Sequence, residues 1–238
     1  MKNLLLPILI TTLILQSCGG EFELVHNKEE PFIKNGGENG MTYKGELYSG
    51  KYIRYWDDGS LTKVKQRCSY IDGIRHGEWI SYHENGQLER KGSYLNGKED
   101  GIWEFYHENG QLSMIGPLLN GGGVGSWIWY FENGNIKSKG SFLNGEINGV
   151  WEIYHENGQL WSKGSYINGK ENGVWEFYYE NGQLTSKSSF LNGEKNGVYE
   201  VYYENGQLQV KGSYLNGKED GVWKSYNEDG SLDSTQTY

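Results

Sequence analysis

Three histidines are spaced so that they could bind a metal ion. His83 and His107 lie 24 residues apart, and His155 follows at twice that interval, so all three occupy one position of a regular pattern. Neutral imidazole is a common ligand of metal ions in proteins. The same position holds Phe131 and Tyr179 in other copies of the pattern. The position therefore favours a flat ring, and we predict stacking and no metal site.

A row of glutamates with the same spacing could supply paired acids and bases. Each glutamate has a lysine at a fixed offset, which favours an ion pair over catalysis. The chain also lacks G-x-S-x-G, a P-loop and H-E-x-x-H, which are signatures of common enzymes. We therefore expect no enzymatic activity and no cofactor. The glutamates are Glu104, Glu152, Glu176 and Glu200.

Two other features suggest chemistry and have a simpler explanation. The stretches 96–101 and 168–173 are polar, but they lack the alternating oxygen ligands and the distal glutamate of a calcium loop, so plain turns are favoured. Cys68 takes a position that glycine fills in other copies of the pattern. We interpret it as a small packing residue and not as a reactive thiol.

All these residues share one spacing because the chain is a tandem repeat. From residue 77 the pattern G-x-W-x-x-Y-x-E-N-G-x-L-x-x-K-G-S-x-x-N-G returns every 24 residues. Such a period indicates an array in which each unit packs on its neighbours, so we expect function to come from a surface. The repeated structural positions are Trp79, Trp103, Trp127, Trp151, Trp175, Trp223, Gly92, Gly140, Gly164 and Gly212.

Each unit reads as a β-hairpin around the Asn-Gly of its E-N-G segment. Asn-Gly between alternating segments predicts a type I′ turn, in which both central residues have positive φ. In this register each tryptophan faces a glycine, and we expect the indole to cover it. The predicted pairs of one unit are Glu156 with Gln159, His155 with Leu160, Glu152 with Lys163, and Trp151 with Gly164.

The predicted fold is all-β. Residues 41–238 should form an elongated, single-layer antiparallel meander of about eight hairpins, with aromatic ladders in place of a globular core. Pro117 lies in the most divergent unit and cannot donate a ladder hydrogen bond, so strand pairing should weaken there.

Strand alternation sorts the side chains onto two faces. We define the tryptophan face by Trp103, Phe105 and their equivalents, and the tyrosine face by Ile102, Glu104, Tyr106 and their equivalents. A single-layer sheet leaves aromatic surface accessible, so the tryptophan face is the predicted docking surface for a protein partner or a second copy. The residues that vary most between units there are the predicted contacts: Phe105, Trp129, Ile153 and Phe177.

The first 40 residues differ from the array. Residues 1–17 carry Lys2 and the apolar run 4–15, which reads as a signal peptide too short for a spanning helix. The tetrad Leu15-Gln16-Ser17-Cys18 resembles a bacterial lipobox, which implies that Cys18 becomes the amino terminus and carries acyl chains such as palmitate. The alternative is an ordinary cleaved signal peptide. Residues 18–40 are expected to be a flexible tether.

These features predict a lipid-anchored protein of the bacterial cell envelope. Gly19 follows Cys18 in place of the aspartate that retains many lipoproteins at the inner membrane, so an outer membrane is expected in a host with two membranes. The formal net charge of the whole chain is −9, and loss of Lys2 with residues 1–17 leaves −10. This balance argues against nucleic acid as a partner.

The repeat signature resembles the bacterial variant of the MORN repeat, in particular the YwqK-like antitoxin components. Gly77, Trp79, Tyr82, Asn85-Gly86 and Gly92 carry the signature in one unit, and later units repeat it across residues 41–238. The resemblance implies a hairpin sheet that acts as a scaffold or protein-binding module, including an antitoxin-like one.

A second resemblance leaves an alternative open. Tyr178-Tyr179 and Tyr202-Tyr203 are similar to the paired aromatics of cell-wall-binding repeats, whose rings grip choline or glucan. A carbohydrate-binding module would need its aromatics in discrete pockets between hairpins, whereas a scaffold would pack them in continuous ladders.

Overall fold

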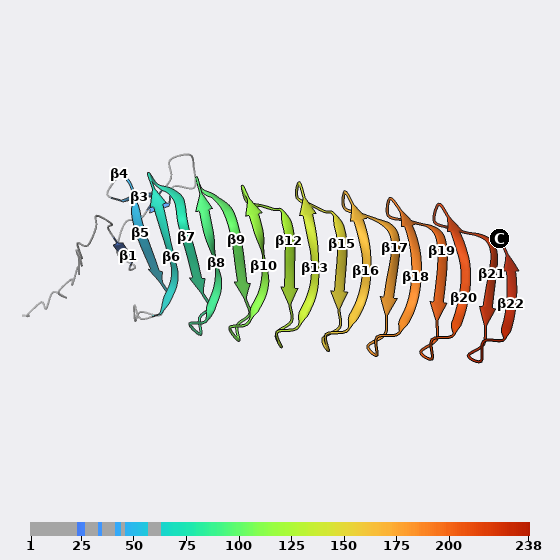
Figure 1. Cartoon of the computed structure of the whole chain (residues 1–238). Helices are drawn as coiled ribbons and strands as arrows, with labels where there is room; N and C mark the ends of the chain where they lie inside the picture. Colours follow the sequence, from blue (N-terminus) through green and yellow to red (C-terminus); the bar gives the residue numbers. More distant parts are fainter. Residues whose placement is uncertain (1–22, 27–32, 35–40, 44–45, 57–62) are drawn as a thin grey trace, which may run out of the picture.

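A computed structural model describes residues 23–26, 33–34, 41–43, 46–56 and 63–238. Every regular element within these ranges is a β-strand. The strands lie side by side in a 19-stranded sheet, and three short ones form a separate 3-stranded sheet. Figure 1 shows the large sheet as one elongated layer with connections along both long edges. The predicted all-β hairpin meander is confirmed.

The large sheet is built from hairpins whose two strands follow each other in sequence. The first hairpins are β5 (Gly50–Tyr55) with β6 (Val64–Ile71), β7 (Ile74–Tyr82) with β8 (Leu88–Leu95), β9 (Lys98–Tyr106) with β10 (Leu112–Leu119), and β12 (Gly125–Tyr130) with β13 (Ile136–Leu143). The others are β15 (Gly149–Tyr154) with β16 (Leu160–Ile167), β17 (Lys170–Tyr178) with β18 (Leu184–Leu191), β19 (Glu194–Tyr202) with β20 (Leu208–Leu215), and β21 (Lys218–Tyr226) with β22 (Leu232–Thr237).

Each hairpin also pairs antiparallel with the next one, so the order in space follows the order in sequence. Two-residue strands, β11 (Gly122–Gly123) and β14 (Glu146–Ile147), lie at the connecting turns. With neighbouring strands about 4.8 Å apart, the array from β5 to β22 is about 70 Å long.

The two kinds of Asn-Gly turn differ from the prediction. The type I′ geometry belongs to the turn between units, where Asn168 has φ +50° and Gly169 has φ +75°. In the E-N-G segment only the glycine has positive φ, as at Gly158 with +87°. There the N–H of Gly158 donates to the carbonyl of His155 at 2.9 Å, which makes a longer turn.

The longer turn corrects the predicted register near the loop. The pairs Trp151–Gly164 and Glu152–Lys163 are confirmed, and Ile153 faces Ser162. A bulge then places Leu160 opposite Tyr154 and not opposite His155, and Glu156 lies in the loop. The prediction was wrong here because Asn157 uses its side chain, and not positive φ, to build the turn: its Oδ1 accepts from the N–H of Gln159 at 2.9 Å.

Pro117 predicts weaker pairing in the divergent unit, but the next junction is paired equally briefly, because β13 and β15 also share two residue pairs and contain no proline. Strand β10 shares only the pairs Met114–Trp129 and Ile115–Ile128 with β12, among the residues that the structure describes. Pro117 still faces Ile102 in β9, and its carbonyl accepts from the N–H of Val124 at 3.1 Å. The short pairing therefore cannot be attributed to Pro117, and the predicted local weakening is not observed.

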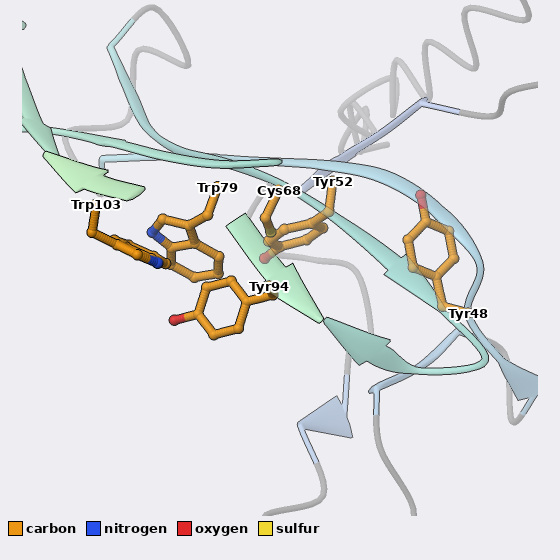
Figure 2. Packing of buried hydrophobic residues seen from close by; sticks show 6 residues of the cluster. All are labelled: Tyr48, Tyr52, Cys68, Trp79, Tyr94 and Trp103. Carbon is orange, nitrogen blue, oxygen red and sulfur yellow. The ribbon is translucent and has the colours of Figure 1, made fainter. Parts of the chain in front are cut away.

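Aromatic side chains replace a globular core on the tryptophan face. Tyr94 lies between two indoles, with ring centroids 5.2 Å from Trp79 and 5.4 Å from Trp103. Trp103 has 0% of its surface exposed. Figure 2 shows these rings with Tyr52 and Cys68 in one cluster along the sheet. The rings stabilise the sheet by covering one another across neighbouring hairpins.

The amino-terminal region is described in part. Signal segment 1–17 and Cys18 lie outside the described residues. Within 18–40, the range assigned to the tether, β1 (Glu23–His26) pairs in parallel with β5, and β2 (Ile33–Lys34) pairs with β3 (Met41–Tyr43), which continues to β4 (Glu46–Leu47). At those residues the backbone pairs with neighbouring strands. No helix in the described residues is long and apolar enough to cross a bilayer.

Candidate interaction surfaces

The four predicted contact residues lie in one row on the tryptophan face. Met114 stands opposite both Phe105 and Trp129, Ser138 lies between Trp129 and Ile153, and Ser162 lies between Ile153 and Phe177. Because they are two strands apart, consecutive members are separated by about 10 Å. The sheet therefore brings them together as a row with small side chains between its later members.

Each ring of this row stacks on the buried tryptophan two residues before it. The ring centroids are 6.2 Å apart for Phe105 and Trp103, and 6.3 Å apart for Phe177 and Trp175. Trp129 also lies 5.2 Å from Trp151 of the next hairpin. The row is half-buried and partly accessible to solvent, whereas Trp103, Trp127 and Trp175 are buried and used in packing.

The tryptophan that covers each glycine comes from the following unit. Gly164 faces Trp151 in the hairpin register, as predicted. A Cβ built on Gly164, however, would lie 2.1 Å from Cδ2 of Trp175. Gly92 meets Trp103 and Gly212 meets Trp223 in the same way. The prediction that the facing indole covers the glycine was wrong, because the ring leans back over the previous hairpin and couples two units.

One unit departs from this pattern at both of the coupled positions. Ser188 takes the glycine position, and the next ring is Tyr199 instead of tryptophan. The serine is buried, with 4% of its surface exposed. A narrower ring leaves space for the added Cβ and hydroxyl, so the two changes compensate each other.

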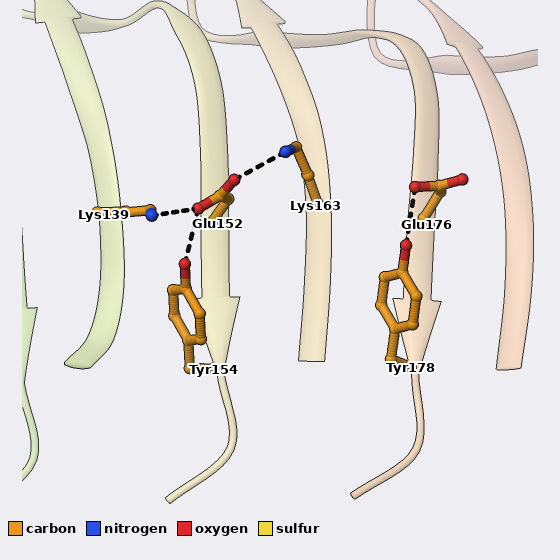
Figure 3. A network of polar contacts seen from close by, with 6 residues as sticks. All are labelled: Lys139, Glu152, Tyr154, Lys163, Glu176 and Tyr178. Carbon is orange, nitrogen blue, oxygen red and sulfur yellow. Dashed lines mark hydrogen bonds and ion pairs between the residues drawn. The ribbon is translucent and has the colours of Figure 1, made fainter. Parts of the chain in front are cut away.

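Charged side chains alternate in a second row, on the tyrosine face (Figure 3). Glu152 is bound from both sides, by Nζ of Lys139 at 2.6 Å and Nζ of Lys163 at 2.9 Å. Equivalent contacts join Lys187 to Glu176 at 3.0 Å and Lys211 to Glu200 at 2.8 Å. The pairs within hairpins were predicted, but the link from Lys139 crosses to the next hairpin and continues the row.

Tyrosines complete the polar row. The hydroxyl of Tyr154 donates to Glu152 at 2.7 Å, and that of Tyr178 donates to Glu176 at 2.8 Å. Burial alone would raise the pKa of Glu152, but hydrogen bonds from Lys139, Lys163 and Tyr154 lower it to about 2. Burial and the bond to Glu176 raise the pKa of Tyr178 to about 12. These groups therefore keep fixed charges near neutral pH, which suits a structural role.

Aliphatic side chains form two exposed rows on the same face, in addition to the predicted surfaces. Ile102 and Val174, from the G-x-W segments, are 56% and 55% exposed. Leu119 and Leu143, from the turns between units, are 55% and 57% exposed. Between Val150 and Val174 the surface has a shallow hollow over Gly164. The sequence signal was the aliphatic residue that precedes most of the repeated tryptophans, with Glu78 and Ser126 as exceptions.

The histidine position is occupied by rings that bind the next unit. Nε2 of His83 lies 3.0 Å from the carbonyl oxygen of Tyr106, so it is assigned as a donor. The hydroxyl of Tyr179 donates to the carbonyl of Tyr202 at 3.1 Å. The position holds a flat ring, which in the histidines and in Tyr179 carries a hydrogen-bond donor at its far end, whereas Phe131 has no donor. The histidines are joined to backbone and not to one another.

Neither metal nor thiol chemistry is indicated in the part of the chain that the structure describes. It contains no group of three or more His, Cys, Asp or Glu arranged to hold a metal ion. Cys68 is buried opposite Trp79, and burial raises the pKa of its thiol. The stretch 96–101 consists of the turn Asn96-Gly97 and the start of β9.

Comparisons with known proteins agree with the repeat architecture. The family described as "MORN repeat variant" matches residues 75–96, 99–120, 124–144, 147–168, 171–192, 195–216 and 219–238. No curated protein matches the chain.

Two solved structures align with most of the chain at low similarity. They are titled "Crystal Structure of TcdB2-TccC3-Cdc42", at 14% identity, and "Crystal Structure of TcdB2-TccC3", at 13%. Both alignments cover 78% of this chain and 12% of the solved chain, with a TM-score of 0.23. The chain thus spans a small part of those proteins, and a TM-score this low says nothing about its function.

Proposed function

The chain belongs to the MORN repeat variant family, and from this premise we propose that it is a non-catalytic scaffold, anchored by lipid to a bacterial envelope membrane, that binds a protein partner. The repeats of this chain form one continuous sheet, and such sheets offer long surfaces of regularly spaced side chains. An antitoxin-like role is the special case in which the partner is a toxin.

The observation that carries the proposal is the half-buried row on the tryptophan face. Phe105, Trp129 and Phe177 are held by stacking on buried tryptophans, so their orientation is fixed before a partner arrives. Pre-ordered aromatic side chains lose little conformational entropy on binding, and they are the residues that carry most binding energy in protein interfaces. Ile153 continues the same row.

Packing of the rings supports a protein scaffold over a carbohydrate-binding module. A ring that grips a sugar must expose its face, whereas Trp103 is fully buried. The hydroxyls of the paired tyrosines are also engaged: Tyr178 donates to Glu176, and Tyr179 donates to the carbonyl of Tyr202. The rings form ladders with their neighbours, which is the arrangement expected of a scaffold.

Partner binding can be tested by replacing the row with a residue that the array already uses there. Ser81 and Ser225 occupy the same row, so replacement of Phe105, Trp129, Ile153 and Phe177 by serine should keep the fold. Crosslinking of the wild type in membranes should give a defined protein adduct, and we expect this adduct to be absent from the variant. Because Ser126 holds the equivalent position on the tyrosine face, the control replaces Val150, Val174, Val198 and Val222 by serine and should keep the adduct. An adduct that persists in the folded tryptophan-face variant would overturn the site.

Anchoring rests on the lipobox-like tetrad that ends at Cys18, which lies outside the described residues. In a bacterial host, Cys18→Ser should move the protein from the membrane to the soluble fraction and abolish incorporation of a fatty-acid analogue. Cys68→Ser is the control, because Cys68 is buried in the sheet and should not change either readout. Equal labelling of the wild type and Cys18→Ser would rule out this anchor.

A further inference from the structure

The charge row of the tyrosine face is interrupted at one place. Ile115 in β10 and Ile128 in β12 take the positions that lysine and glutamate hold in the later hairpins, and they are direct cross-strand partners. Exposed Ile102 and Leu119 flank them on the same face. An apolar centre with a charged rim has the composition of a protein interface.

The charges on the two sides of this centre are opposite in sign at three of the four nearest distances; three strands outward, uncharged Ile80 corresponds to Lys163. One strand outward from the isoleucines, Glu104 stands on one side and Lys139 on the other. Two strands outward, Lys91 corresponds to Glu152. Four strands outward from the isoleucines, exposed Arg67 corresponds to Glu176. A rotation that exchanges the two sides therefore superimposes opposite charges.

From this order we propose that the patch centred on Ile115 and Ile128 binds a second copy of the chain, face to face. The two-fold axis runs parallel to the strands, between the isoleucines. Ile115 of one copy then faces Ile128 of the other, Glu104 faces Lys139, and Lys91 faces Glu152. Each contact occurs twice, as a symmetric dimer requires. A partner with a different sequence would not be expected to carry the complementary order of charges.

The dimensions of the patch define the kind of dimer. Six strands about 4.8 Å apart and about six residues of each strand give about 24 by 20 Å, or about 500 Å² for each copy. The total of about 1,000 Å² is at the lower limit for a specific interface. Because each sheet twists, two long arrays would touch at their centres and diverge towards their ends. We expect dimerisation at micromolar concentration.

This dimer does not depend on the proposed tryptophan-face partner. The two surfaces lie on opposite sides of one layer, so a dimer leaves Phe105, Trp129, Ile153 and Phe177 accessible in both copies. The serine variant of that row should therefore remain dimeric, and failure of either proposal can be recognised separately.

The first test replaces the apolar centre with a residue that the fold accepts. Ile115→Lys introduces the residue present at Lys91, Lys139 and Lys163 in the same repeat position, and it faces Glu104 within the chain. In a dimer it would bury a charge against Ile128. Sedimentation velocity of the full chain in density-matched detergent should give a dimer for the wild type and a monomer for this variant.

The control for this test is Val198→Lys, which changes an exposed aliphatic residue of the same face in β19, far from the centre. It should remain dimeric. A monomeric wild type at micromolar concentration, or a dimeric Ile115→Lys variant, would overturn the proposal.

The second test uses the predicted reciprocity of the charges. In a homodimer Glu104→Lys places lysine against Lys139, and Lys139→Glu places glutamate against Glu104, so each variant alone should be mainly monomeric. In a mixture, each replaced residue faces an opposite charge, and the two variants should form a heterodimer. Absence of the heterodimer from a mixture of two folded variants would reject this geometry even if the wild type dimerises by another surface.

Discussion

At the scale of single residues, a glycine and an indole from different units are matched in size. The backbone of Gly164 is extended, so an alanine there is allowed by its φ, but a Cβ would overlap the ring of Trp175. Ser188 with Tyr199 shows how the array accommodates a larger residue. Cys68 is the exception, since it holds the glycine position opposite the indole of Trp79.

We therefore expect Gly164→Ala to lower the free energy of unfolding by about 2 kcal/mol, the usual cost of overpacking. Ser165→Val, on the opposite face beside Gly164, should cost much less. The double variant Gly164→Ser with Trp175→Tyr should be more stable than the sum of its single changes predicts. Urea unfolding followed by circular dichroism measures these variants and the two single changes of the double variant. Equal losses for Gly164→Ala and Ser165→Val would contradict the assigned cover.

The ion-pair row should make stability depend on acid pH. The pKa of Glu152 is lowered to about 2 in the folded protein, whereas an unperturbed glutamate has a pKa of about 4.3. A lowered folded-state pKa stabilises the fold above the unfolded value, and this contribution disappears as the pH falls from about 4 to about 2.

The melting temperature of Glu152→Gln should accordingly lie below that of the wild type near neutral pH, with the difference shrinking as the pH falls through this window. Glu156→Gln, whose exposed side chain lies in the loop, is the control and should follow the wild type. A constant difference across the window would show that the loss in Glu152→Gln does not come from ionisation.

At the scale of the hairpin, side chains at the turns join one unit to the next. Nδ2 of Asn157 donates to the carbonyl of Glu180 at 3.1 Å, while its Oδ1 holds the turn. At the opposite edge the N–H of Gly169 donates to the carbonyl of Ile147 at 2.9 Å. The turns on both long sides of the sheet are thus joined to the next unit by hydrogen bonds.

Replacement of Asn157 by aspartate separates these two roles. The carboxylate can still accept from the N–H of Gln159, but the donor to Glu180 is lost, so we expect a loss of about 1 kcal/mol or more. Within the described chain, Asn181 makes the within-turn bond and no bond to the next unit. Asn181→Asp should therefore cost less, as judged by thermal melts of both variants. Similar losses of stability in both variants would show that the effect comes from the turn and not from the hydrogen bond to Glu180.

At the scale of the whole molecule, stability is shared along the array. Each hairpin contacts the hairpins before and after it, through the glycine cover, the ion-pair row and the edge bonds. Such a chain should behave as a series of units coupled to their nearest neighbours.

Deletion of residues 147–170 removes one period and rejoins Glu146 to Glu171 within an unchanged pattern. The shortened chain should keep its β spectrum and melt at a lower temperature, because one set of contacts between units is lost. Circular dichroism with thermal unfolding tests this. Loss of folding, or an unchanged melting temperature, would contradict an array with nearest-neighbour coupling.

The sequence by itself determined the hairpin array, the two faces and most cross-strand pairs, including Trp151 with Gly164 and Glu152 with Lys163. It could do so because alternation along a strand and a fixed period are local properties. It also placed Phe105, Trp129, Ile153 and Phe177 on one face, where the structure aligns them in a row.

Only the tertiary structure decided how the units meet. It assigned positive φ to Asn168 and not to Asn157, and it showed that Trp175 and not Trp151 covers Gly164. It also extended the charge row from Lys139 to Glu152 across two hairpins. These features depend on bulges that change the register and on side chains reaching into the next unit. A repeat pattern gives every unit the same residues, so it cannot tell a contact within a unit from the equivalent contact with its neighbour.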